Sequence, residues 1–154
     1  MANAITPENI SGFVVGEGCF YVEFGKDGMY KNKIRVRPSF VIEIAEDDIE
    51  VLRQIKDLIG CGTVYQVDFG RYQKYQEKKW KKHARYKVSN IADISTKLVP
   101  FFDKSPLFGK KQRAFDLFKQ VVQKVLQKDH LKADGLKEIS ILVDQLRIVN
   151  KRGI

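Results

Sequence analysis

The carboxylate of Glu17 is the first candidate for chemistry, because it stands at the end of a predicted helix. Thr6-Pro7-Glu8 predicts the helix start, with Thr6 as the N-cap and Pro7 in the first position, where its missing N–H would be unpaired anyway. The helix then runs from Pro7 to about Gly16. A carboxylate is unfavourable at a helix C-terminus, and a bound cation would compensate it. Glu17 is therefore either a metal ligand or an exposed acid at a helix end.

Two glycines lie on one face of the same predicted helix. Gly12 and Gly16 are four residues apart, which is about one helical turn. Neither has a side chain, so another backbone can approach this face closely. The helix therefore offers a packing surface directly beside the candidate metal ligand.

A second group of candidates lies on two predicted hairpins. Over 33–44, apolar residues alternate with basic and polar ones, so one face belongs to the core and the other to solvent. A two-stranded ribbon fits the major groove of DNA, where arginine can bond guanine edges, while lysine neutralises phosphate. The alternative is a wet face whose charge only maintains solubility. The candidate DNA-binding residues are Tyr21, Glu23, Lys26, Lys31, Lys33, Arg35, Arg37, Ser39, Tyr65, Arg71, Lys74, Arg85 and Lys87.

The charge of the whole chain supports an anionic partner. Its 28 lysines and arginines exceed its 19 aspartates and glutamates, which gives a net charge of +9. Basic proteins of this kind attract polyanions. The positive side chains concentrate on one predicted sheet face, and this distribution favours nucleic acid.

An α+β fold is expected to position these side chains. Periodicity and turn signals predict an order of α-β-β-α-β-β-α followed by two more helices, with an antiparallel sheet covered by helices on one face. Residues 1–154 are expected to form a single domain. The predicted helices are 7–16, 46–59, 91–102, 110–128 and 135–149, and the predicted strands are 19–24, 33–44, 63–69 and 84–88. Asn90 is the expected N-cap of the third helix, and 101–106 is expected to be a connector.

Several classes of protein are not expected. No run of about 18 apolar residues could span a membrane, and the N-terminus lacks the regions of a secretory signal. Cys19 and Cys61 are too few for a disulfide framework and lack metal-ligand spacing. His83 and His130 have no partner at catalytic or ligand spacing, and we expect both on the surface. An intracellular protein is the expectation.

One segment resembles the signature of a known family. Ile10-Ser11-Gly12-Phe13-Val14-Val15-Gly16-Glu17-Gly18 resembles the LAGLIDADG motif of homing endonucleases. The motif is short, but here it ends a predicted helix that leads into a basic hairpin, as the family plan requires. The likeness continues through the helix that ends at 59–62 and through 106–111, and it fades after about Lys128.

The resemblance implies a homodimer that binds double-stranded DNA on a saddle-shaped sheet. The motif helices of two copies would pack through Gly12, Phe13, Val15 and Gly16. An isologous contact of this kind implies a palindromic or nearly palindromic DNA site. Both strands would be cut, leaving short 3′ overhangs, as in intron homing.

The resemblance also implies a metal-dependent reaction. Glu17 and the Gly16 carbonyl would bind Mg²⁺, for which Mn²⁺ could substitute, and Lys111 would lie near the scissile phosphate, with Lys110 as the second choice. The family has aspartate more often at the position of Glu17, and the carboxylate is kept. Glu43 and Ile44 are the nearest matches to the family's water-positioning glutamine, but neither resembles it. Glu43 is a weak candidate because it would point toward the wet face.

Two alternatives share the basic sheet. A non-cleaving relative could act as an intron RNA maturase or as a DNA-binding regulator. A basic RNA-associated protein would explain the charge but not the glycine-spaced helix. Because Glu17 and Lys111 are both present, the sequence favours the nuclease.

Overall fold

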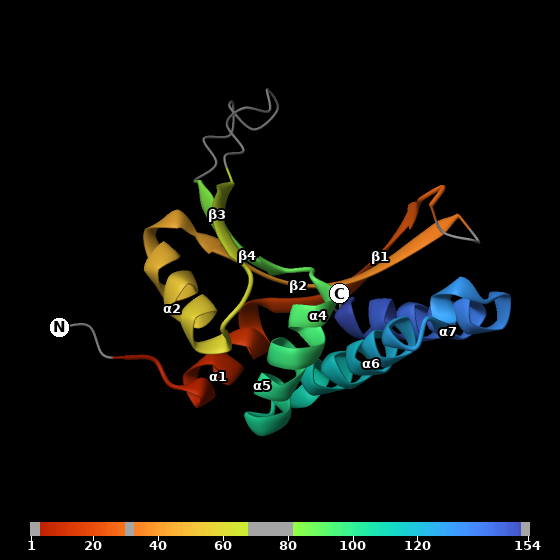
Figure 1. The fold of residues 1–154 in the computed structure, drawn as a ribbon. Coiled ribbons are helices and arrows are strands. Elements are labelled where there is room, and N and C mark those ends of the chain that lie inside the picture. The colour runs from red at the N-terminus through yellow and green to blue at the C-terminus, as the bar shows by residue number, and fades with distance from the viewer. Residues whose placement is uncertain (1–3, 30–32, 68–81, 152–154) are drawn as a thin grey trace.

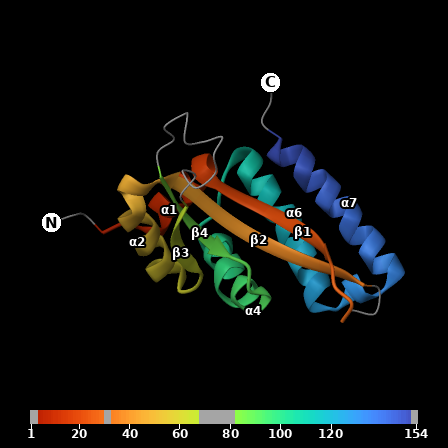
Figure 2. The same cartoon turned by 90° about the horizontal axis from the view of Figure 1, so that it is seen from above.

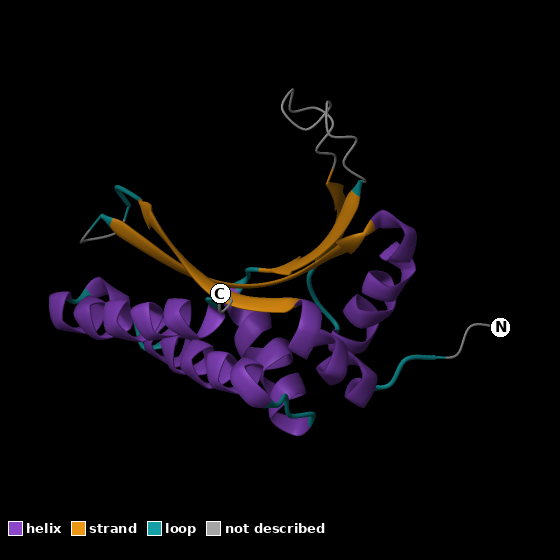
Figure 3. Cartoon of the chain, turned by 180° about the vertical axis from the view of Figure 1, so that it is seen from behind, coloured by secondary structure: helices purple, strands orange, loops and turns teal. Residues whose placement is uncertain are grey.

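A curved antiparallel sheet covered by helices on one face is the frame of the molecule. The structure, a computed structural model, describes residues 4–29, 33–67 and 82–151. The strands lie in the order β1-β2-β4-β3, and the helices pack below the sheet while its concave face stays open (Figures 1 and 3). This confirms the predicted α+β class and saddle. The strands are β1 (Gly18–Lys26), β2 (Ile34–Ala45), β3 (Thr63–Val67) and β4 (His83–Val88).

The helices follow the predicted order closely. The helix predicted over 46–59 begins as a short 3-10 turn before α2, and a second short turn, which was not predicted, precedes α7. Among the described residues, no helix is long and apolar enough to cross a membrane. The helical elements are α1 (Pro7–Glu17), η1 (Glu46–Asp48), α2 (Ile49–Ile59), α4 (Ile91–Asp93), η3 (Ile94–Leu98), α5 (Val99–Lys104), α6 (Gly109–Leu126), η4 (Asp129–Leu131) and α7 (Ala133–Asn150).

Alternation along the strands separates core from concave face. Phe20, Phe40 and Tyr86 are fully buried, and the residues next to them in sequence are half-buried, apart from the small Ser39, which is fully buried. The Phe20 ring is 4.8 Å from that of Phe40 and 5.1 Å from that of Phe118 on α6, measured between centroids. This aromatic contact packs the sheet against α6 and sets the distance between the two layers.

Helix α1 starts as the sequence predicts. The Thr6 hydroxyl accepts a hydrogen bond from the Asn9 backbone N–H at 3.1 Å, and the Asn9 side chain accepts one from the Thr6 N–H at 3.0 Å. Both donors would otherwise be unpaired at a helix start. The helix buries Ile10 and Val14, and Ser11 donates to the Ser105 carbonyl at 2.6 Å, which ties α1 to the end of α5.

The single helix predicted over 91–102 is more complex in the structure. Asn90 caps it as predicted, accepting from the Asp93 N–H at 3.1 Å. The chain then continues through α4, the π-helical η3 and α5, and it reaches Lys104 instead of ending at Phe102. Helical hydrogen bonding therefore continues into the stretch that we expected to be a connector.

The last two helices lie under the β1 edge of the sheet. Figure 2 shows α6 and α7 running beside β1, and Asn150 at the end of α7 donates to the Phe20 carbonyl at 2.7 Å. This bond pairs a carbonyl of an edge strand that has no neighbouring strand on that side. The C-terminal helix is therefore attached to the same strand that follows Glu17.

Candidate functional site

A pocket of about 630 Å³ opens where four elements meet. They are the end of α1, the start of β1, the start of α6 and the end of α7. Gly16 and Glu17 line it from one side, and Lys110 and Lys111 line it from another. The structure thus places together the predicted metal ligands and the two predicted basic residues.

The position of Glu17 depends on the glycine that follows it. The chain leaves α1 at Gly18 and enters β1 at once, with an extended backbone (φ −84°, ψ 156°). A Cβ at Gly18 would lie 2.6 Å from a Val14 methyl and 3.2 Å from the Phe40 ring. Only glycine fits this turn without a shift of the core, so the motif ends in glycine for a packing reason. The side chain of Glu17 is left exposed at the pocket.

Lys111 is held close to the same turn. Its ammonium group donates to the Gly18 carbonyl, across 93 residues of sequence, and the residue is half-buried. Lys110 lies beside it and is exposed. Of the two lysines, Lys111 is therefore the one with a fixed position next to Glu17.

Sequence reasoning missed the contribution of α7. Asn150 and Lys151 line the pocket with Cys19, although they come from the far end of the chain. The apolar stripe of α7 was predictable, but no local signal connects its last residues to the motif. Of the charged residues that the structure describes, Lys110, Lys111 and Lys151 therefore line the pocket beside one carboxylate, that of Glu17.

The donors at this pocket fit a divalent cation such as Mg²⁺. Among the described residues, no three histidines, cysteines or carboxylates come together as a metal cage. One carboxylate and one carbonyl, from Glu17 and Gly16, suit an ion that keeps several waters and also takes phosphate oxygens. Waters and phosphate oxygens would complete the coordination of such an ion.

Most predicted DNA-binding residues of the strands lie on the concave side of the sheet. Lys26 is an exception, because it pairs with Ile34 and lines a pocket with Leu136 of α7 on the helix-covered side. Lys26 and Lys33 are exposed near the tip of the first hairpin, whereas Ser39 is fully buried. Ser39 is a small residue opposite Tyr21 in the middle of the sheet, so it presents no surface to a ligand, and its expected accessibility is wrong. Lys31, Arg71 and Lys74 lie outside the described residues. The half-buried members are Tyr21, Glu23, Arg35, Arg37, Tyr65, Arg85 and Lys87.

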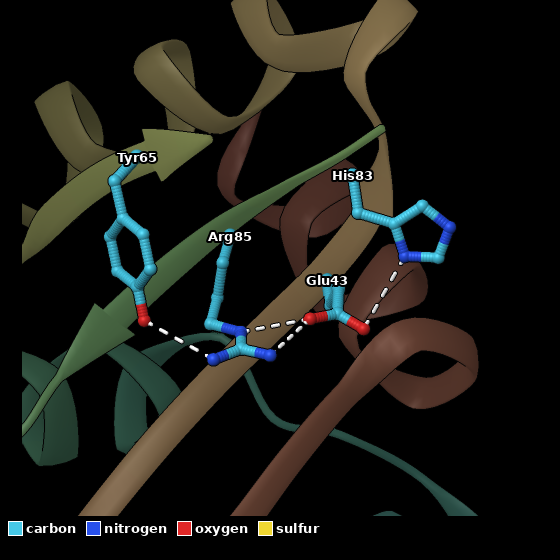
Figure 4. Close-up of polar contacts among 4 residues, drawn as sticks. All are labelled: Glu43, Tyr65, His83 and Arg85. Atoms are coloured by element: carbon cyan, nitrogen blue, oxygen red, sulfur yellow. Dashed lines mark hydrogen bonds and ion pairs between the residues drawn. The ribbon is translucent and has the colours of Figure 1, made fainter. Parts of the chain in front are cut away.

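Four side chains form a connected network on this concave face (Figure 4). The Nε of Arg85 donates to Glu43 Oε1 at 2.9 Å, and a second guanidinium nitrogen contacts the same oxygen. Glu43 Oε2 lies 3.5 Å from His83 Nδ1, and Tyr65 Oη lies 3.4 Å from Arg85 Nη1. Burial alone would lower the pKa of Arg85, but the hydrogen bonds that Arg85 donates to Tyr65 and Glu43 raise its pKa overall, so the guanidinium stays charged.

A looser cluster lies further along the sheet. Lys87 Nζ is 3.7 Å from Glu23 Oε1 and 5.8 Å from the centre of the Tyr21 ring. The hydrogen bond to Tyr21 raises the pKa of Lys87, and Glu23 adds to this effect. The concave face thus carries two acids, each paired with a base and lying near a tyrosine.

Comparison with known proteins identifies the family. Residues 10–122 match the family described as LAGLIDADG endonuclease, which is most of the chain. The chain belongs to this family. The curated relatives that it matches are longer proteins, and it spans about a quarter of the length of the first three.

Three similar proteins show how this LAGLIDADG chain relates to others. It is 30% identical over 135 residues to "Probable intron-encoded endonuclease 2" of Neurospora crassa, which covers 88% of this chain and 28% of that protein. The crystal structure of the homing endonuclease I-TnaI has a TM-score of 0.80 at 26% identity and covers 96% of this chain and 97% of that one. I-LtrWI bound to target DNA has a TM-score of 0.82 at 26% identity, with 94% and 45% covered.

The LAGLIDADG helix of this chain is α1, and its two sides differ. Ile10 and Val14 are buried, whereas Gly12 and Gly16 are exposed, and a Cβ at either glycine would meet no atom within 4 Å. Phe13 is only half-buried. The described residues of one chain therefore leave the glycine face of the motif helix uncovered, and α7 lies outside the stretch that matches the family.

Proposed function

We propose that this chain is a homing endonuclease that acts as a homodimer and cuts both strands of a long palindromic or nearly palindromic DNA site. The observation that carries the proposal is the pocket that joins Glu17 to Lys111 beside a basic concave sheet. Relatives named as intron-encoded or homing endonucleases support the activity, and a similar structure bound to target DNA supports the substrate. We place this protein among intron-encoded nucleases on the same basis.

In the proposed reaction, Glu17 and the Gly16 carbonyl hold a divalent cation, Mg²⁺ or Mn²⁺. When bound, such a cation supplies Lewis-acid stabilisation of charge on phosphate oxygens. The lysines of the pocket place positive charge around the scissile phosphate, and the bond from Lys111 to the Gly18 carbonyl keeps one ammonium group next to Glu17. Cleavage of both strands with short 3′ overhangs completes the proposal.

The proposed dimer uses the uncovered face of α1. Gly12 and Gly16 leave room for a second backbone, and the half-buried Phe13 and Val15 add apolar contacts. The pairing of two identical helices would bring two copies of Glu17 to one axis, and each copy would serve one DNA strand. The length of the I-LtrWI chain, of which this chain covers 45%, fits two such units in one protein.

The deciding experiment uses the purified full chain and a randomised palindromic DNA library. Incubation with Mg²⁺, Mn²⁺, Ca²⁺ or a chelator, followed by sequencing of cut and bound DNA, reports cleavage and binding separately. We expect double-strand cleavage with Mg²⁺ and Mn²⁺, and sequence-selective binding without cleavage in Ca²⁺.

Glu17→Gln is the matched test of the site, with Glu8→Gln as its control. Both residues are exposed carboxylates of α1, at its opposite ends, and each substitution removes one negative charge. Glu17→Gln should abolish cleavage and retain DNA binding, whereas Glu8→Gln should retain both. Selective DNA binding without cleavage by the unaltered chain in any metal would instead favour the regulator, and selective RNA binding would favour the maturase.

A further inference from the structure

Glu43 is an acid in an unexpected place, because it lies on the same concave face as the bases Arg35, Arg37, Arg85 and Lys87. Its side chain is 31% exposed, and Arg85 and His83 surround the carboxylate (Figure 4). Phosphate oxygens repel a carboxylate, and a carboxylate that loses water under DNA needs hydrogen-bond donors in its place. The bases of DNA are the donors that a groove-bound sheet can reach.

The position of Glu43 places it at the inner end of the sheet. Tyr65, Arg85 and Glu43 form one row across β3, β4 and β2, since each is the strand partner of the next. Glu43 directly follows Ile42, whose partner on β1 is Gly18, and Glu17 directly precedes Gly18. This row is therefore the part of the concave face nearest to the candidate metal ligand.

We propose that Glu43 and Arg85 together determine the specificity for one G·C base pair, the innermost pair that each subunit reads. This proposal rests on the proposed function. Guanine presents two acceptors, O6 and N7, to the major groove, and cytosine presents the N4 amino donor. The guanidinium donates to guanine, and the carboxylate accepts from cytosine.

Both side chains have hydrogen-bonding capacity left after pairing with each other. Arg85 uses Nε and Nη2 on one carboxylate oxygen, and Nη1 lies 3.4 Å from Tyr65 Oη. Within the described part of the chain, Glu43 Oε2 contacts the His83 ring, at 3.5 Å. A guanidinium has five N–H donors and a carboxylate has about four acceptor sites, so the ion pair can persist while each partner contacts a base.

The acid adds selectivity through what it rejects. A carboxylate cannot donate, so at a position where it meets thymine O4 or the guanine acceptors it faces repulsion and loses its hydrogen bond. Arginine alone tolerates several acceptors. The pair is therefore more selective than Arg85 would be without Glu43.

Glu23 supplies a matched control on the same face. It is also a half-buried acid paired with a base, but its distance to Lys87 is 3.7 Å and its side chain is 42% exposed. It lies further along β1, opposite Arg37. Glu23→Gln and Glu43→Gln change the net charge equally. They differ in position, because only Glu43 belongs to the row of Tyr65 and Arg85.

The test is a binding-site selection in Ca²⁺ with the full chain and its variants Glu43→Gln, Glu23→Gln and Arg85→Lys. We expect the unaltered chain to select G·C at the innermost specified position of each half-site by about 5- to 150-fold, the range for one good base contact. Glu43→Gln should relax that position, because an amide both donates and accepts, and should leave the other positions unchanged. Arg85→Lys should relax the same position, since lysine lacks the planar fork.

The outcomes separate this proposal from the proposed function. If the unaltered chain selects a DNA sequence but Glu43→Gln keeps the full G·C preference, the specificity role is overturned and the endonuclease proposal stands. Relaxation of the same position by Glu23→Gln would also overturn it, because a general charge effect would then explain the result. A chain that selects no DNA sequence overturns both. Thermal melting of each variant checks that a lost preference does not come from a lost fold.

Discussion

Replacing Gly12 by alanine should affect the single chain and the proposed dimer in opposite directions. Gly12 lies in the middle of α1, it is exposed, and a Cβ there would meet no atom within 4 Å of the same chain. In an isolated chain the added methyl is therefore harmless. In a dimer that packs α1 against its own copy, the same methyl enters the contact between the two helices.

The two magnitudes can be worked out separately. Glycine in a helix interior is less stable than alanine by about 1 kcal/mol, so the free energy of unfolding of a monomer should rise by about that amount. An extra methyl in a close-packed contact costs about 1–3 kcal/mol. Two-fold symmetry places two copies of the methyl in the interface, so the dimer should weaken by about 2–6 kcal/mol. Since about 1.4 kcal/mol corresponds to tenfold, the dimer Kd should rise roughly 30-fold or more.

Sedimentation equilibrium measures this Kd for the unaltered chain, Gly12→Ala and the control Gly28→Ala. Gly28 follows β1, and a Cβ there also meets no atom within 4 Å, but it is not on α1. The control should leave the Kd unchanged. A Gly12→Ala chain that dimerises as tightly as the control would refute the packing of α1 against its own copy, and so would an unaltered chain that is monomeric at every concentration.

Three further outcomes follow from single positions. Lys111→Ala should abolish cleavage and change the affinity for DNA by no more than a few-fold. Lys110→Ala should retain most of the cleavage activity, because the Lys110 side chain is exposed. An equal loss of cleavage in both variants would contradict the fixed position of Lys111. Gly62→Ala should destabilise the fold by about 2–4 kcal/mol, because φ is +96° and the new Cβ would lie 2.4 Å from the Tyr86 ring, and an unchanged Tm would disprove this. Burial holds the pKa of His130 below its ordinary value of 6.5, and Asp129 only partly opposes this, so below about pH 6.5 the unfolded state binds a proton that the folded state does not. The free energy of unfolding should therefore decrease as the pH is lowered through this range. His130→Gln should make this decrease smaller in urea melts. An identical pH dependence in the variant would rule out His130 as the cause.

The fold was largely predictable because its signals are local. Alternation assigned the two sheet faces, Thr6 and Asn90 marked helix starts, and Gly60 marked a helix end that the structure confirms with φ +91°. The failures need tertiary information. Ser39 was expected on the surface, but larger neighbours cover it, and His130 was expected on the surface but is 8% exposed.

The site was predictable where a motif carries it and not elsewhere. Glu17 and Gly16 follow from one short segment, and the pocket brings Lys111 to them as expected. Asn150 reaches the same pocket from 130 residues beyond Phe20, and no pattern within α7 indicates that contact. Glu43 was a weak candidate because it does not resemble the family's glutamine and was expected to point toward the wet face. Its contact with Arg85 depends on cross-strand register, which the sequence alone does not give.

The charges of this protein divide between affinity and selectivity. A net charge of +9 favours any DNA, since neutralised phosphates release counterions whatever the sequence. Additional lysines on the concave face would strengthen this attraction equally for right and wrong sites. An acid such as Glu43 acts oppositely, because it weakens attraction to every site and recovers the loss only where a base offers a donor. Specificity on a strongly basic surface is therefore expected to come from its paired acids, and Glu43→Gln should bind random DNA more tightly while it distinguishes sites less well.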